Sequence, residues 1–122
     1  MSFCNKHGIL VEAYAPIGDG DRSHMRDAPI FASLASSYQV TIGQLIMSYN
    51  FQTGADIVIP RSSQASHQAE NLGLFVKGGK PVVTISEVDI AAIAGNHTYG
   101  KVYHVSQRRR SLLCVWGVAG FS

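Results

Sequence analysis

Apolar residues recur along this chain with two different periods. A mostly apolar stretch over residues 9–14 follows Gly8, which predicts a helix end capped by glycine and then a β-strand. From Pro29 to Tyr38 the apolar positions recur at helical spacing and predict an amphipathic helix. The segment between these two elements is polar and rich in glycine and aspartate, which predicts a loop.

A second helix is predicted by a capping-box pattern, in which Thr41 is followed three residues later by Gln44. This helix is expected to end near Gly54. Residues 57–59 then form a short, continuously apolar strand that is stopped by Pro60. Such a strand is typical of a parallel sheet that is buried on both faces.

Two further helices are predicted in the second half of the chain. Residues 64–74 have a helical pattern, and Ser86 with Asp89 three residues later is a capping pattern that opens another helix. The pair Gly78-Gly79 lies between them and predicts a turn.

The order of these elements predicts an α/β fold. Strand, loop, helices, strand, loop and helix is the βα alternation of a protein with a parallel sheet. Two βα units plus extra helices do not close a sheet, since a β/α barrel needs about eight strands and roughly 250 residues. The chain has 122 residues and therefore supplies only part of a barrel. We expect exposed strand edges and self-association through them.

The amino-acid composition is that of a globular protein. Apolar residues make up 46% of the chain and charged residues 15%, which is typical of globular proteins. The lack of a signal-peptide pattern and of an apolar run of roughly 20 residues predicts a cytoplasmic protein with no membrane partner. Cys4 and Cys114 fit neither a disulfide framework nor a metal spacing, so we expect reduced thiols and no metal site.

Charge is distributed unevenly along the chain. Residues 1–100 contain six basic and eight acidic residues, a balance of −2, whereas residues 101–122 contain four basic residues and no acid, a balance of +4. The run of arginines at 108–110 is compatible with binding to nucleic acid or anionic lipid, but a solvated run of charges is the commoner explanation. Because no aromatic residue is interleaved with the run, no nucleic-acid partner is expected.

Residues 59–63 (IPRSS) form a candidate anion site. They lie where an apolar strand ends and a helix begins, where free backbone N–H groups and the helix dipole favour an anion. Arg61 adds a positive charge there. Taken alone, the segment is better explained by Arg61 pairing with a surface carboxylate and by Ser62 or Ser63 capping the helix.

Other segments favour the anion site over this simpler explanation, because together they resemble one family. Residues 8–18 (GILVEAYAPIG) resemble the aldo-keto reductase pattern GI-V-AYSPLG, which forms the seventh barrel strand and its loop. Residues 57–62 (IVIPRS), followed by Glu70-Asn71, resemble the family's VIPKS…R..EN signature, and residues 41–45 (TIGQL) resemble its TPAQV helix start. The match runs in order, with the right gaps, from about residue 3 to residue 95.

The resemblance implies the C-terminal portion of a (β/α)8 TIM barrel over residues 1–98, followed by a divergent tail over residues 99–122. It also implies a site for NADPH or NADP+, with NADH as a second candidate cofactor. By the resemblance, Tyr14 stacks on the nicotinamide, and the loop over the pyrophosphate contains Ile17, Gly18 and Asp19. The segment that holds the 2′-phosphate contains Arg61, Ser62 and Ser63, and the resemblance also implies an ion pair between Asp21 and Arg61. The adenine is bound by Glu70 and Asn71. For Tyr14 alone, an aromatic side chain packed in the core is the competing interpretation.

Two of the resembling positions depart from the family pattern. Ala15 stands where the family usually has serine, so one hydroxyl on the phosphate side is missing. His67 stands where the family has an arginine on the adenine phosphate, and a histidine is only partly charged at neutral pH. An exposed helix residue without a ligand is the alternative for His67. Arg61 replaces the commoner lysine and keeps the cation.

The family's catalytic groups have no counterpart in this sequence. The family reduces aldehydes and ketones by hydride transfer, using a tyrosine supported by a lysine, an aspartate and a histidine from the first half of the barrel. Tyr38, Lys77 and His97 match other segments, so no catalytic residue is assigned. We expect a fragment, a truncated gene product or half of a split protein.

Two functions remain open at this point. The first is the NADP(H)-binding portion of an aldo-keto reductase, inactive alone and acting on a small carbonyl substrate only in the complete enzyme. The second is a noncatalytic nucleotide-binding or interaction module derived from that fold.

Overall fold

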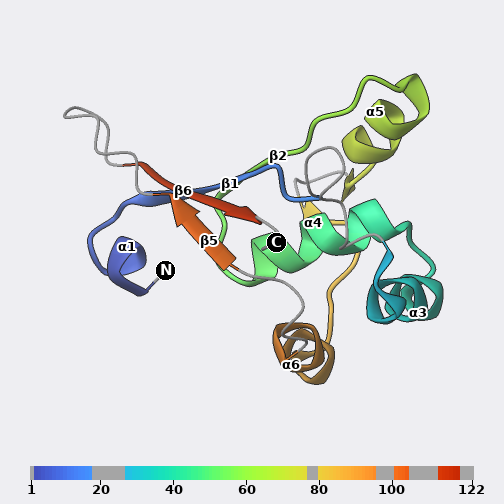
Figure 1. The fold of residues 1–122 in the computed structure, drawn as a ribbon, viewed down its shortest axis with the longest axis horizontal. Helices are drawn as coiled ribbons and strands as arrows, with labels where there is room; N and C mark the ends of the chain where they lie inside the picture. Colours follow the sequence, from blue (N-terminus) through green and yellow to red (C-terminus); the bar gives the residue numbers. More distant parts are fainter. Residues whose placement is uncertain (1, 18–26, 77–79, 96–100, 105–112, 119–122) are drawn as a thin grey trace.

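A computed structural model describes residues 2–17, 27–76, 80–95, 101–104 and 113–118 of the chain. The elements in chain order are α1 (Ser2–Lys6), β1 (Leu10–Tyr14), α3 (Pro29–Tyr38), α4 (Ile42–Gln52), β2 (Ile57–Ile59), α5 (Ala65–Leu72), β3 (Phe75–Val76), β4 (Lys80–Pro81), α6 (Glu87–Gly95), β5 (Lys101–His104) and β6 (Leu113–Val118). The larger sheet and α1 lie toward one end of the molecule, α3 and α5 lie toward the other, and α4 runs through the middle (Figure 1).

Two parallel strands form the part of the larger sheet that the sequence predicted. β1 pairs with β2 in parallel, with Ala13 opposite Val58. Asp56 sets this register by a reciprocal pair of hydrogen bonds: its backbone N–H donates to the carbonyl of Val11 at 2.8 Å, and the Val11 N–H donates to its carboxylate at 2.8 Å. The parallel α/β arrangement of these two units is therefore confirmed.

The C-terminal tail adds two strands that the sequence did not predict. β6 runs parallel to β1 along the edge opposite β2, and β5 pairs with β6 in antiparallel fashion, so the sheet order is β2-β1-β6-β5. A separate two-stranded antiparallel ladder joins β3 and β4, and the turn predicted at Gly78-Gly79 lies outside the described residues. β2 is consequently an edge strand of the larger sheet.

The two faces of the sheet differ in burial. On β1, Val11 and Ala13 are buried, whereas Leu10 and Tyr14 are each 54% exposed. On β2, Ile57 and Ile59 are exposed and only Val58 is partly buried. The prediction that residues 57–59 are buried on both faces is therefore wrong, because α4 packs against one face of β2 and the other face stays open.

Helix α4 forms the centre of the core. Leu45, Ile46 and Met47 are at most 1% exposed, and α4 contacts α3, α5 and β2. Its start matches the predicted capping box, since the backbone N–H of Gln44 donates to the Thr41 hydroxyl at 3.1 Å and the Thr41 N–H donates to the Gln44 side chain at 3.3 Å. The local signal in the sequence thus fixes where the central helix begins.

The segment before α6 is attached to the end of α4. The Gln52 side chain accepts from the backbone N–H of Ile85 at 2.7 Å and donates to the carbonyl of the same residue at 2.9 Å. Both backbone polar groups of the fully buried Ile85 are thereby satisfied by one amide side chain.

A second attachment joins α3 to the first turn of α6. The Tyr38 hydroxyl donates to the carboxylate of Asp89 at 2.5 Å and accepts from the backbone N–H of Ser86 at 2.9 Å. The Ser86 hydroxyl also donates to Asp89, at 2.7 Å, and accepts from its N–H at 3.2 Å, which confirms the predicted cap. These hydrogen bonds, chiefly the one from Tyr38, lower the pKa of the Asp89 carboxyl.

The prediction of reduced thiols is wrong for Cys4. This residue is 7% exposed, packs beside Val11 and Ala13 and is disulfide-bonded. Gly8, with a φ of 64°, ends the short helix that carries Cys4, as its position in the sequence predicted.

Within the described ranges, no single helix is both long and apolar enough to cross a membrane. The pair α3 and α4 meets those criteria of length and composition only when the two are taken together across a bend of 92°.

We expect the Asp89 carboxylate to make stability depend on pH. Because its pKa lies below that of an unfolded aspartate, near 3.9, its contribution is fully present above about pH 4 and is lost as the pH falls through the lowered value. In thermal unfolding between pH 6 and pH 2.5, the wild type should lose more stability than Asp89→Asn. Glu87→Gln, in the same helical turn, serves as the control and should follow the wild type; identical pH profiles for wild type and Asp89→Asn would contradict the assignment.

We propose that a second copy of this chain associates through the β2 edge, because an edge strand offers unpaired backbone groups and Ile57 and Ile59 add exposed apolar surface beside it. Ile57→Lys should raise the dissociation constant of the self-associated form by about tenfold or more, since a charge would enter that contact. Glu12 lies opposite position 57, so the lysine is tolerated within the monomer. Sedimentation velocity over a range of concentrations measures this, with Val88→Lys on α6 as the control; equal association of the two variants would exclude this edge.

Candidate functional site

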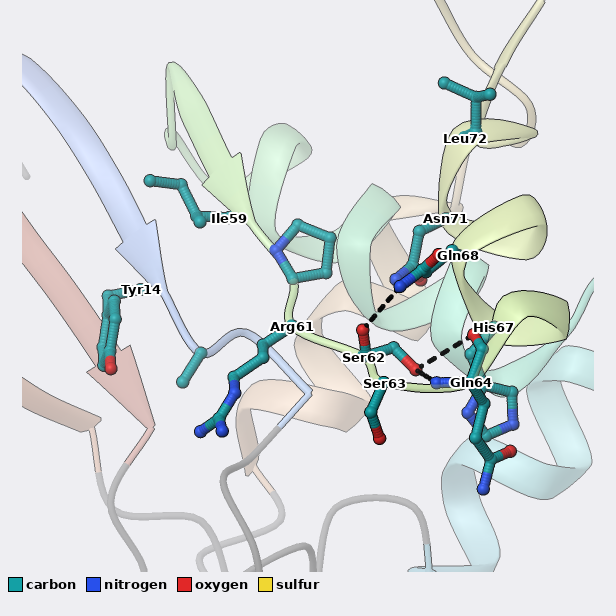
Figure 2. A pocket seen from close by; sticks show the side chains of 12 residues that line it. Tyr14, Ile59, Arg61, Ser62, Ser63, Gln64, His67, Gln68, Asn71 and Leu72 are labelled. Atoms are coloured by element: carbon teal, nitrogen blue, oxygen red, sulfur yellow. Dashed lines mark hydrogen bonds between the residues drawn. The ribbon is translucent and has the colours of Figure 1, made fainter.

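An open pocket lies where β1 and β2 end and α5 begins. It has a volume of about 1170 Å³. The residues that line it are Tyr14, Ala15, Ile59, Pro60, Arg61, Ser62, Ser63, Gln64, His67, Gln68, Asn71 and Leu72. Figure 2 shows Tyr14 and Ile59 on the two strands at one side and the α5 residues at the other, with Arg61 on the loop between them.

The parallel pairing of β1 with β2 creates this pocket. Because the strands run in the same direction, their carboxyl ends meet at one edge of the sheet, and the segments after them face each other there. Ala15 has a φ of 48°, a left-handed conformation that is uncommon for a residue other than glycine, and it turns the chain directly after β1. Pro60 ends β2 and begins the loop that carries Arg61.

Hydrogen bonds within the loop fix its shape. The Ser62 hydroxyl accepts from the backbone N–H of Gln64 at 3.1 Å and donates to the carbonyl of Gln64 at 3.4 Å. The side chain of Gln68, one turn into α5, donates to the carbonyl of Ser62 at 2.9 Å. Figure 2 shows these bonds as dashed lines between the loop and the helix. The loop is thus tied to the first turns of α5.

The electrostatic character of the pocket favours an anion. Arg61 carries a positive charge and His67 a side chain that gains one on protonation, while none of the described residues that line the pocket carries a carboxylate. Two serine side chains add hydroxyl groups, and α5 begins here without a side-chain cap and without an acid in its first turn. The positive end of the helix dipole therefore contributes to the same potential.

The side of the pocket formed by the second half of α5 has a different chemistry. Leu72 is 82% exposed and offers an apolar surface, while Asn71 has a buried side-chain oxygen with no hydrogen-bond partner among the described residues. The amide oxygen and nitrogen of an asparagine can exchange places by a flip, so either polar atom can face this side. Such a combination suits a flat ring with polar edges.

The structure brings most of the predicted site residues together. Those that line the pocket are Tyr14, Ala15, Arg61, Ser62, Ser63, His67 and Asn71. Ile17 lies instead in the core, 9% exposed, among the residues around α4. Glu70 does not line the pocket either, since its carboxylate accepts a hydrogen bond from Thr41. Gly18, Asp19 and Asp21, and with Asp21 the expected ion pair to Arg61, lie outside the described residues.

The sequence interpretation missed two glutamines of the pocket. Gln64 and Gln68 lie on the same helical face as His67 and Asn71, because residues three and four apart in an α-helix are neighbours. The spacing of three residues, from Gln64 to His67 and from Gln68 to Asn71, therefore already indicated that these glutamines belong to the same face. Leu72 was not expected to line a site either.

Comparisons with known proteins find sequence similarity to several oxidoreductases, aldo-keto reductases among them. No family model matches the chain. Glycerol 2-dehydrogenase (NADP(+)) of Saccharomyces cerevisiae is 29% identical over 93 residues, which is 76% of this chain and 27% of that protein. An aldo-keto reductase of Bombyx mori is 32% identical over 82 residues, 62% of this chain and 26% of the relative. The chain thus spans only about a quarter of the length of these relatives.

Solved structures agree with the sequence matches. The crystal structure of an aldo/keto reductase from Brucella melitensis superposes with a TM-score of 0.61 at 29% identity, covering 75% of this chain and 31% of that one. An aldo-keto reductase structure from Bombyx mori gives a TM-score of 0.59 at 22% identity, which supports the fold alone. The chain is thus similar, in sequence and in fold, to members of the aldo-keto reductase family over part of their length.

Proposed function

We propose that this chain is the NADP(H)-binding portion of an aldo-keto reductase, drawn from the C-terminal part of its barrel. One observation carries the proposal: a pocket with two basic side chains, two serine hydroxyls and a helix N-terminus, and no carboxylate among the described residues that line it. A phosphate group is the anion that such donors bind best. The yeast relative, whose name includes NADP(+), adds support.

The 2′-phosphate of NADP(H) fits the end of the pocket that carries Arg61. A guanidinium is a forked, permanently charged donor that binds a phosphate through two parallel hydrogen bonds. Ser63 follows it on the same loop and presents a further hydroxyl donor, while the Ser62 hydroxyl is bonded to Gln64 within the loop. The adenine ring would then lie along α5, where Asn71 and Leu72 offer a polar edge and an apolar surface.

In the proposed assignment, the described residues that line the pocket supply binding groups. Tyr14 lies at the end of β1 and is 54% exposed, so its ring is available to a planar group at that side of the pocket. Tyr38, the other tyrosine considered from the sequence, is bonded to Asp89 and Ser86 and does not line the pocket. In the proposed assignment, hydride transfer to a carbonyl substrate needs groups from the remainder of a complete reductase.

We expect the isolated chain to bind NADPH more tightly than NADH and to distinguish them through Arg61. Removing the guanidinium in Arg61→Ala should weaken NADPH binding by about tenfold or more, since a hydrogen bond between charged groups contributes about 1.5–3 kcal/mol. NADH binding should hardly change. Fluorescence titration with both nucleotides measures this, with Arg61→Lys as the variant that keeps the charge. Equal affinities of the wild type for NADPH and NADH would contradict the proposal.

We expect no NADPH-dependent reduction of a small aldehyde by the isolated chain. Binding a cofactor does not accelerate a reaction unless groups that stabilise the transition state and supply the proton are also present. The measurement is loss of NADPH absorbance with a panel of aldehydes, in protein purified free of other reductases. Turnover that disappears in Tyr14→Phe would show that the chain contains a reaction centre after all.

We also expect His67 to make NADPH binding depend on pH. A histidine changes its charge between about pH 5 and 8, so its attraction for the 2′-phosphate should fade as the pH rises. The other titratable or charged groups among the described residues that line the pocket are Arg61 and Tyr14. The preference for NADPH over NADH should fall by about three- to tenfold from pH 6 to pH 8.

The control for this prediction is His67→Arg, which keeps a cation at every pH tested. The 2′-phosphate itself changes charge near pH 6, and that effect is common to both proteins. The difference between the two pH profiles therefore isolates the imidazole. Superimposable profiles would show that His67 does not contact the phosphate.

A further inference from the structure

Helix α5 forms one wall of the pocket but has no buried residue. His67, Gln68 and Asn71 reach the pocket from it, so its position decides where these side chains lie. Most of the stability of a short helix in a protein comes from packing an apolar face against the core, and α5 lacks such a face. The position of this wall must therefore depend on interactions other than burial.

Glu70 provides such an interaction, on a face of α5 that does not line the pocket. Its carboxylate accepts a hydrogen bond from the Thr41 hydroxyl, and its backbone carbonyl accepts one from the side chain of Gln44 at 3.4 Å. Both partners belong to the capping box that begins α4. The pocket wall is thus attached to the start of the helix that is most deeply buried in the molecule.

The charges of this attachment are favourable. A carboxylate beside the first turn of a helix interacts well with the positive end of the helix dipole, and α4 has no acidic residue of its own in its first turn. The Thr41 hydroxyl acts in both directions, since it accepts from the Gln44 N–H and donates to Glu70. One chain of hydrogen bonds therefore links the start of α4, through Thr41, to the α5 wall of the pocket.

We propose that Glu70 is a positioning residue, which holds the α5 wall of the nucleotide pocket through Thr41. The proposal deepens the proposed function, on which the identity of the ligand rests. It adds to the role that the family resemblance implies, in which Glu70 bonds the adenine. The two roles make different predictions for Thr41, which does not line the pocket: only the positioning role makes nucleotide affinity depend on it.

A double-mutant cycle on NADPH affinity separates these roles. Thr41→Val and Glu70→Ala should each weaken binding by about three- to tenfold, the equivalent of one hydrogen bond. The double variant should bind NADPH with the same affinity as whichever single variant binds it less tightly, because both changes break the same link. Weakening by Glu70→Ala with no effect of Thr41→Val, or effects that multiply in the double variant, would overturn the proposal.

Two controls separate the link from general damage to α4. Thr41→Ser keeps the hydroxyl and should restore the affinity. Thr53→Val removes a hydroxyl that bonds the carbonyl of Tyr49 at the other end of α4, so it perturbs the same helix without touching α5. It should leave the affinity for NADPH unchanged. A loss in Thr53→Val equal to that in Thr41→Val would assign the effect to helix stability and overturn the proposal.

A measurement without ligand keeps this test independent of the proposed function. Amide hydrogen exchange reports on the backbone bonds of α5, among them Gln68 N–H to Gln64 and Gly73 N–H to Ala69. Exchange at these amides should be about three- to tenfold faster in Thr41→Val and in Glu70→Ala, and unchanged in Thr53→Val. If NADPH fails to bind the wild type, the proposed function fails, while unaltered exchange in both variants would overturn the positioning role by itself.

Discussion

The burial of α4 is the constraint on which the rest of the molecule depends. Burying one large aliphatic side chain contributes about 1.5–3 kcal/mol, and Leu45, Ile46 and Met47 are all buried on this helix. The helix then accepts the sheet, α3 and α5 on its different sides. Even polar positions of α4 are enclosed: Asn50 is fully buried and donates to the carbonyl of Ile46 at 2.8 Å.

Side chains at the two ends of α4 hold the neighbouring elements. At the start, the Thr41 capping box reaches α5 through Glu70, and at the end Gln52 holds Ile85 and with it the entry to α6. α6 receives a second attachment from Tyr38 at the end of α3. A few directed hydrogen bonds thereby join α5 and the segment before α6 to a deeply buried helix.

Elements that the sequence predicted well have local causes. The capping box at Thr41, the cap at Ser86 and the glycine after α1 each depend on residues within a few positions, so their structures follow from the sequence nearby. The pairing of β6 with β1 joins positions about a hundred residues apart, and no local pattern specifies it. The exposure of β2 likewise depends on how many layers cover the sheet, which a short apolar run does not reveal.

The candidate site shows the same division between local and distant causes. The positions of Arg61 and Ser62 after an apolar strand indicated an anion site, and His67 with Asn71 marked one face of the following helix. Glu70 is next to Asn71 in the chain, but a step of one residue turns the side chain about 100° around the helix. Which of the two faces the pocket depends on where α4 lies, and this is known only once the fold is known.

The two ends of the pocket depend on different parts of the molecule. Tyr14 and Ile59 line it from strands whose outer face is open, so any polypeptide that covers this face in a longer relative also shapes that end of the pocket. The end with Arg61 and Ser62 rests on the loop and on α5, which are held by hydrogen bonds within the described residues. In the proposed function, a phosphate would be held at the Arg61 end by groups on this loop and on α5, whereas the strand end is open among the described residues. The Arg61 end of the pocket is therefore held together by contacts within a chain that spans about a quarter of the length of its relatives, which is what the proposed phosphate site requires.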